Sequence, residues 1–427
     1  MTVKQNYRPR IADSLLVRKL KGKGAVLLEG AKWCGKTTTA EQICKSVLYM
    51  SQPGKREQNI QLARLNPELL LRGDKPRLID EWQVAPLLWD AVRFEADHSD
   101  RFGLFVLTGS SVPADMSEVI HSGTGRFAWL KMRPMSLWES GESTGDVSLA
   151  SIFDGNLDIA GISDLSLERM AFVTCRGGWP SAIDMEDEIA LDQAFDYVTA
   201  VEQRDISQAD GVDRNPVRVH RLLRSYARNQ GQQVNNAALK ADLIENEGDT
   251  LDTDTIAAYI KALKRIFVID DVEAWNPNLR SKTAIRSADT RYFTDPSIAT
   301  AALGLGPSDL IADLETFGLI FETLCMRDLR IYAESLNGNV YHYRDKNGLE
   351  CDAVVHLRDG RYGLVSMKLG GDINIEHGAK TLNALSAKID TTKMKAPAFM
   401  MVLTATGDYA YRREDGVLVV PVGCLRN

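Results

Sequence analysis

The chain has 427 residues, 44% hydrophobic and 26% charged, a composition typical of a globular protein with roughly two to four domains. A net charge of −7 excludes a uniformly basic surface, so any nucleic-acid contact must come from a local patch. No apolar run is long enough to cross a membrane, and the polar, basic N-terminus lacks the apolar core of a signal peptide. We therefore expect a cytoplasmic protein that does not contact membranes.

Residues 24–133 alternate short apolar runs with longer helical patterns. Strands are expected at 24–30, 76–80, 103–111 and 126–132, and helices at 37–49 and 83–97. A polar loop is expected between the last two strands. This alternation predicts parallel strands joined by crossover helices, an α/β sheet covered on both faces.

A change of composition separates this region from the rest of the chain. Residues 139–164 are rich in Gly, Ser and Asp, which predicts a linker and a domain boundary near residue 145.

Residues 190–270 are predicted to be helical. Two amphipathic helices, 217–229 and 252–267, bracket a third at 235–244. Their apolar stripes consist of Val219, Leu222, Leu223, Tyr226 and Ala227 in one helix and Ile256, Tyr259, Ile260 and Leu263 in the other.

The C-terminal pattern is α+β. A helix at 318–335 precedes three strand-like runs separated by the turn pairs Asn347-Gly348 and Asp359-Gly360. Six scattered cysteines form no CxxC pair and no metal-spaced cluster, so we expect neither a disulfide scaffold nor a zinc site.

One segment fits the phosphate-binding pattern GxxxxGK[ST] between a strand and a helix. Its backbone N–H groups and the start of the helix are expected to surround the phosphates of ATP. Lys36 is expected to reach the β and γ phosphates, and the Thr37 hydroxyl to bind Mg²⁺. The predicted nucleotide-binding residues are Gly30, Ala31, Lys32, Trp33, Cys34, Gly35, Lys36, Thr37 and Thr38.

Two acidic residues end the strand at 76–80, where open α/β sheets bind ligands. Asp80 is predicted to hold Mg²⁺ through water, and Glu81 to orient and deprotonate the attacking water. The alternative for both is an acidic entrance to the next helix.

Further polar residues follow on the next two strands. Thr108 and Ser110 are expected at the same edge, either near the γ phosphate or simply in a turn. Arg126 is a candidate for stabilising transition-state charge, in its own site or a neighbouring subunit's, or else a solvated surface group.

These residues carry a family resemblance. GAKWCGKTT, LIDEWQ, VLTGSS and GTGRFAWLKMRPMSLWE resemble the AAA-type ATPase module that many bacteria and archaea join to a C-terminal domain of unknown function. AVEQRDIS, LDTDTIAAYIKALKRIFVIDDV, TRYFTDPSIATAAL, GLIFETL and YRDKNGLECDAVV resemble the same family, so the likeness spans nearly the whole chain. It implies an AAA+ P-loop ATPase domain at 1–145, a helical, winged-helix domain at 146–310 and an α+β, PD-(D/E)XK restriction-endonuclease-like domain at 311–427. No settled biological role comes with it.

The second half contains candidate DNA contacts. Six basic residues and no acidic one occur between 214 and 241, and the helix at 252–267 occupies the recognition-helix place of a winged helix. The candidate contacts are Arg218, Arg221, Arg224, Arg228, Lys261 and Lys264. The alternatives are a solvated helix face or an interface with the acidic ATPase domain.

The nuclease-like end matches its pattern incompletely. Glu322, Asp352 and Lys368 match the resembled fold, but Ser366 stands where a glutamate is expected. A hydroxyl binds a hard divalent cation more weakly than a carboxylate does, and Glu350, on the same strand side as Asp352, is a candidate substitute. We expect a degenerate domain without cleavage activity.

The sequence therefore predicts a Mg²⁺-dependent AAA+ ATPase that couples ATP binding and hydrolysis to movement of C-terminal domains. Two alternatives stay open: an ATP-gated regulator or defence component that binds duplex DNA, and an ATPase that acts on a protein partner. Related ATPases often act in rings, but no self-complementary pattern settles whether this chain forms a homo-oligomer.

Overall fold

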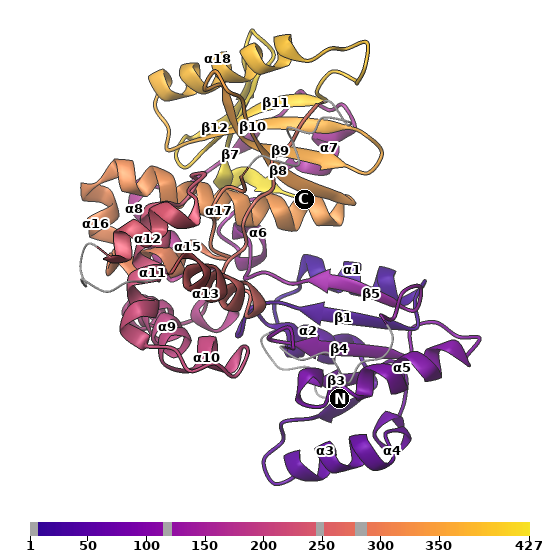
Figure 1. The fold of residues 1–427 in the computed structure, drawn as a ribbon. Coiled ribbons are helices and arrows are strands. Elements are labelled where there is room, and N and C mark those ends of the chain that lie inside the picture. Colours follow the sequence, from indigo (N-terminus) through magenta and orange to yellow (C-terminus); the bar gives the residue numbers. More distant parts are fainter. Residues whose placement is uncertain (1–6, 114–121, 245–251, 278–287) are drawn as a thin grey trace. The chain divides into compact units, whose positions relative to one another are not determined.

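The computed structural model describes residues 7–113, 122–244, 252–277 and 288–427 (Figure 1). The chain divides into two compact units. The first comprises Met1–Pro134, Arg204–Arg214 and Lys261–Phe267, and the second comprises Met135–Gln203, Asn215–Ile260 and Val268–Asn427. The predicted polar loop falls largely on 114–121, outside the described residues.

The first unit is built on a five-stranded parallel sheet in the order β2-β3-β4-β1-β5. The strands are β1 (Ala25–Glu29), β2 (Ser46–Tyr49), β3 (Arg77–Asp80), β4 (Phe105–Gly109) and β5 (Phe127–Lys131). The helices are α1 (Ile11–Leu20), α2 (Lys36–Ile43), α3 (Arg56–Leu65), α4 (Glu68–Leu71), η1 (Trp82–Val84), α5 (Leu88–Asp97) and α10 (Ile206–Gln208). The predicted parallel α/β sheet is confirmed.

One predicted helix was too long. Instead of reaching residue 49, α2 ends at Ile43, because Cys44 adopts an extended conformation with φ −79° and ψ 143°. The following residues form β2, whose Val47 and Leu48 pair with β3 in parallel register. Strand pairing at the sheet edge therefore overrides the helical pattern read from the sequence.

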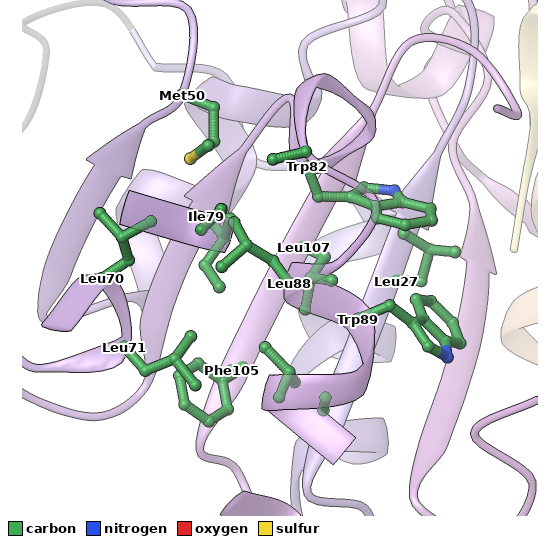
Figure 2. Close-up of a cluster of buried hydrophobic side chains, with 14 of the residues drawn as sticks. Leu27, Met50, Leu70, Leu71, Ile79, Trp82, Leu88, Trp89, Phe105 and Leu107 are labelled. Carbon is green, nitrogen blue, oxygen red and sulfur yellow. The ribbon is translucent and has the colours of Figure 1, made fainter. Parts of the chain in front are cut away.

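The core of this unit lies on one face of the sheet (Figure 2). Leu27, Ile79 and Leu107 point from three strands toward Trp82 and α5. Trp89 of α5 stacks on Phe127 of β5, with the ring centroids 3.9 Å apart and an angle of 11° between the ring planes. Side chains alternate along strands, so the equally buried neighbouring positions supply the opposite face, next to α1 and α2.

The second unit contains a seven-stranded mixed sheet in the order β7-β12-β13-β11-β10-β9-β8. Its strands are β7 (Gly161–Ile162), β8 (Gly338–Arg344), β9 (Glu350–Leu357), β10 (Tyr362–Lys368), β11 (Phe399–Thr404), β12 (Tyr409–Arg412) and β13 (Leu418–Pro421). A small parallel pair joins β6 (Val147–Ser148) to β14 (Leu425–Arg426). The three predicted C-terminal strands are confirmed as β8, β9 and β10, antiparallel to their neighbours in that series.

Helices α17 (Leu314–Ser335) and α18 (Asp372–Lys388) pack against this sheet, and further helices extend the unit. The further helices are α6 (Leu137–Ser140), α7 (Leu149–Phe153), α8 (Leu167–Arg176), α9 (Asp187–Ala200), α11 (Pro216–Arg228), α12 (Asn236–Ile244), α15 (Pro296–Leu303) and α16 (Pro307–Ala312), with short 3-10 turns η2 (Pro180–Ala182) and η4 (Val422–Cys424). The chain passes between the units through the π-helical turn η3 (Val201–Asp205) and α13 (Thr253–Arg265). All five stripe residues predicted for α11 are buried.

The predicted linker is part of the second unit. Residues 139–164 contain α7 and the short strands β6 and β7, which pair with β14 and β12 near the C-terminus. Met135 N–H donates to Gly178 O at 2.6 Å, and Leu137 N–H donates to the buried Asp328 carboxylate at 2.9 Å. These contacts lie within the second unit, whose chain begins at Met135.

Among the residues that the structure describes, no helix combines the length and apolar character needed to cross a bilayer.

Candidate nucleotide site

The phosphate-binding loop connects β1 to α2 through backbone conformations that require glycine. Gly30 has φ +157°, and a Cβ there would lie 2.0 Å from Met132 O. Gly35 has φ +99° and precedes the first residue of α2. A side chain at Gly30 would force the loop away from β5, so the glycine pattern has a direct structural cause.

Lys36 lies inside this loop. Its side chain is 5% exposed, and its ammonium donates to Gly30 O at 2.8 Å and to Ala31 O at 2.7 Å. Neutral carbonyls are weaker acceptors than phosphate oxygens, so an incoming anion would compete favourably for this ammonium.

Other residues brace the loop from outside. The Arg10 guanidinium donates to Cys34 O at 2.8 Å and to Arg133 O at 2.9 Å. Lys32 pairs with Asp205 at 2.6 Å. Trp33 has φ +66° and is 51% exposed, so its ring lies at the surface of the loop. Thr38 occupies the first turn of α2.

Asp80, at the end of β3, is joined to α2 and β4 by two hydroxyls. Thr37 Oγ1 donates to Asp80 Oδ1 at 2.6 Å, and Thr108 Oγ1 donates to the same oxygen at 2.7 Å. Thr108 is fully buried and also accepts a 3.3 Å bond from Glu81 N–H. The carboxyl ends of β3 and β4 and the start of α2 therefore meet at Asp80.

Glu81 stands on a strained backbone next to this cluster. Its φ and ψ are +58° and 51°, the left-handed region, which costs a non-glycine residue about 1 kcal/mol. Ser110 Oγ donates to Glu81 Oε2 at 2.9 Å, and Gln83 Nε2 donates to the same oxygen. Structure thus brings Glu81 and Ser110 together, as the strand-end positions predicted.

Arg126 lies at the other edge of the sheet. Its neighbour Phe127 is in register with Ala25, at the amino end of β1, whereas the phosphate-binding loop follows the carboxyl end. Arg126 pairs with Asp97, and this hydrogen bond lowers the pKa of that carboxyl. A residue that opens a parallel strand lies opposite the phosphate edge, so this placement does not favour a role for Arg126 in its own site.

The residues present fit ATP and Mg²⁺. The loop offers backbone N–H groups, an ammonium and a helix start to a triphosphate. The hydroxyl of Thr37 and the carboxylate of Asp80 converge within 2.6 Å, and both are oxygen ligands of the kind Mg²⁺ prefers. Within the described ranges, no group of three or more His, Cys, Asp or Glu side chains could hold a metal ion.

The second unit has its own polar centre. Asp352 on β9 accepts from Ser366 Oγ at 3.0 Å and from Met367 N–H at 2.6 Å, and its Oδ2 lies 3.6 Å from Lys368 Nζ. Two cavities, of about 430 and 580 Å³, are both lined by Glu322; Asp352 lines the first and Lys368 the second.

Glu322 has an unusual environment in this centre. Burial raises its pKa well above the ordinary value, the nearby Asp352 raises it further, and Lys368 opposes the shift. The Tyr292 hydroxyl lies 3.5 Å from Glu322 Oε2. Glu350 is exposed and paired with Arg344 at 3.6 Å. The three residues matched to the nuclease pattern are therefore neighbours.

The basic candidates occur on two helices. On α11, Arg224 and Arg228 are exposed, whereas Arg218 and Arg221 are partly buried. Lys261 and Lys264 are exposed on α13, in its portion that belongs to the first unit.

Three features of the nucleotide site had no clear signal in the sequence. Gln83 contacts the predicted base, and Asp205 contacts the loop from a position 173 residues away. Thr108 joins Asp80 to Glu81, a role that its place in VLTGSS does not distinguish from turn chemistry.

Comparison with known families divides the chain into three matched segments. Residues 22–140 match a family model described as an AAA domain. Residues 167–309 and 317–425 match two models described as domains of unknown function, DUF8612 and DUF4143. No curated protein matches the chain.

Among solved structures, the chain is similar to a Walker-type ATPase of Pyrococcus abyssi. The two share 14% sequence identity and a TM-score of 0.43, over 70% of this chain and 97% of that one. This likeness is too distant to indicate a function. The AAA-domain match and the geometry of the loop nevertheless support a P-loop ATPase domain in the N-terminal part of the chain.

Proposed function

We propose that the protein is a Mg²⁺-dependent ATPase of the AAA+ type. The observation that carries this proposal is the meeting of Lys36, the Thr37–Asp80 pair and Glu81 at the carboxyl edge of one parallel sheet. A cation, a metal-binding oxygen pair and a base are the parts that phosphoryl transfer to water requires.

Each residue has a distinct task in hydrolysis. Lys36 exchanges its carbonyl partners for phosphate oxygens and stabilises their charge. Glu81 accepts a proton from water as the water oxygen bonds to the γ phosphorus and the bond to the bridging oxygen breaks, releasing ADP. Bound Mg²⁺, held by Thr37 and through water by Asp80, would neutralise charge on the phosphates.

The same loop supports a route for coupling to the rest of the chain. Asp205, the partner of Lys32, belongs to the segment Arg204–Arg214, which is part of the first unit although second-unit chain flanks it on both sides. Phosphates in the loop would attract Lys32 and repel the Asp205 carboxylate. ATP binding is thus proposed to weaken this ion pair and to move the C-terminal domains through the connected chain.

Two substitutions test the ATPase. Lys36→Ala should weaken ATP binding by about a hundredfold or more, since it removes charge-assisted hydrogen bonds. Glu81→Gln should preserve binding and reduce turnover by about 10² to 10⁴. Lys55→Ala and Glu57→Gln, on an exposed surface, serve as charge-matched controls. Parent-like turnover in Glu81→Gln would show that another group is the base.

A second candidate function is ATP-gated binding to duplex DNA. It is favoured by exposed Arg224, Arg228, Lys261 and Lys264 and by the order of elements. Helices α11, α12 and α13 precede the antiparallel bridges Ile269–Phe293 and Val272–Thr290, an arrangement consistent with a winged helix. Gel retention should weaken steeply with salt, and charge-removing variants of the four residues should reduce the salt slope.

A protein partner, three functional parts and a homo-oligomer are further proposals. An ATPase acting on a protein partner would show no DNA retention. We also propose three functional parts, with limits 1–145, 146–310 and 311–427. The last of them is proposed to be a degenerate nuclease-like domain. A homo-oligomer would allow Arg126 to act in a neighbouring site.

A further inference from the structure

Gln83 lies against the proposed base. In η1, two residues after Glu81, its Nε2 donates to Glu81 Oε2 and lies 3.4 Å from Ser110 Oγ. Ser110 Oγ donates to the same Oε2. Both bonds thus end on one carboxylate oxygen, and Glu81 Oε1 receives neither of them.

The orientation of the Gln83 carboxamide follows from this contact. An ionised carboxylate only accepts hydrogen bonds, so the amide nitrogen must face Glu81 and the amide oxygen must point away. That oxygen is buried and has no hydrogen-bond partner among the described residues. Trp82 Nε1 is also buried without a hydrogen-bond partner among the described residues. A Cβ added to Gly109 would lie 3.3 Å from Gln83 Oε1 and 3.1 Å from Trp82 Nε1.

A buried acceptor without a partner lowers stability, so this orientation of the Gln83 amide carries a cost that its contacts with Glu81 and Ser110 must offset. The left-handed backbone of Glu81 is a second unfavourable feature of the same three-residue turn. This turn brings Gln83 back onto the Glu81 carboxylate, and the Glu81 N–H bond to Thr108 holds it there.

We propose that Gln83 is a positioning residue for ATP hydrolysis. With Ser110 it fixes Glu81 Oε2, so that Oε1 faces the attacking water and takes its proton. This inference rests on the proposed role of Glu81 as the base.

Gln83→Met tests it, because methionine keeps the length of the side chain and removes its amide. Turnover should fall about tenfold, the effect expected for losing a hydrogen bond to a charged group, while KM and the ATP dissociation constant change less than twofold. Gln83→Glu, which places a second carboxylate against Glu81, should reduce kcat at least as much. Gln193→Met, at a partly buried glutamine of α9 whose Nε2 donates to Ile189 O of the same helix, is the matched control.

The double variant Glu81→Gln with Gln83→Met separates positioning from a structural effect. In single-turnover measurements the methionine should change the rate of the Glu81→Gln protein by less than twofold, because the base it positions is gone. An equal loss in both backgrounds, or parallel losses of binding and turnover, would overturn the role of Gln83. If Gln83→Met fails to fold, the kcat of Gln83→Glu decides. Unchanged turnover in Glu81→Gln alone would instead overturn the proposed function.

Discussion

The two polar centres of the protein differ in what neutralises their carboxylates. At the phosphate-binding loop, Asp80 accepts from two neutral hydroxyls, and the nearby Lys36 is bound to carbonyls. In the second unit, Asp352 accepts from Ser366 and a backbone N–H and also lies beside Lys368. The first centre keeps its cation and its acid available to a ligand, whereas the second balances its charge internally. Similar polar side chains can therefore be open to a ligand in one centre and paired with one another in the other, depending on which cations and hydroxyls the fold places beside them.

The largest effect is expected from introducing a carboxylate into the second polar centre. Ser366 is buried, and its Oγ lies 3.2 Å from where a Cβ on Gly378 would stand. Ser366→Glu should therefore lower the free energy of unfolding by about 3 kcal/mol, through crowding and a buried like charge next to Asp352. Urea unfolding measures this, with Ser366→Ala, expected to cost about 1 kcal/mol, as the control. A stable variant with Mg²⁺-dependent nicking would contradict our view of this centre.

Thr108→Val should be next in size. It removes the donor to Asp80 and the acceptor of Glu81 N–H, at a total of about 2 kcal/mol, or roughly thirtyfold in turnover. Steady-state ATPase rates measure the loss. The matched control is Thr404→Val, since the buried Thr404 hydroxyl has no hydrogen-bond partner among the described residues and should tolerate replacement. Parent-like rates for Thr108→Val would mean that the cluster does not position the base.

Glu322→Gln tests the second polar centre through the pH dependence of the protein's stability. The folded pKa of Glu322 is raised above its ordinary value of 4.5 by burial, so the folded state binds the proton more tightly than the unfolded state. Its stabilising effect is present below about pH 4.5 and is lost as pH rises through the folded pKa. Stability of the parent should decline over that window by at most about 1.4 kcal/mol per pH unit, and Glu322→Gln should flatten the decline. Urea midpoints at several pH values measure it, and an unchanged slope would contradict the raised pKa.

The smallest effect is expected at Arg126. Its charge lies at the amino edge of the sheet, paired with Asp97, so Arg126→Gln should change turnover by less than twofold in dilute protein. A tenfold loss at every protein concentration would contradict this placement. A loss that appears only in concentrated protein would favour action in a neighbouring subunit's site.

Local patterns predicted much of the first unit because its site residues lie in one loop and at the ends of parallel strands. The phosphate-binding loop is a single segment, and Asp80, Glu81 and Ser110 follow strand ends that any parallel sheet gathers at one edge. The helix through residue 49 was wrong, and the strand pairing within 139–164 was not predicted, because the partners are distant. β2 pairs with β3 across about 30 residues, and β6 pairs with a strand near the C-terminus. Composition carries no record of such partners.

The phosphate-binding loop and the parallel sheet were predictable from the sequence because both follow from local conformational preferences. The sequence also showed that Ser366 stands where the resembled nuclease pattern expects a glutamate. Tertiary packing was needed to show that Gln83 turns back onto Glu81, that Asp205 meets Lys32 and that Asp352 lies beside Lys368. These contacts depend on which side chains the packed backbone brings within 3 to 4 Å, and electrostatic and hydrogen-bonding energies change steeply over that distance.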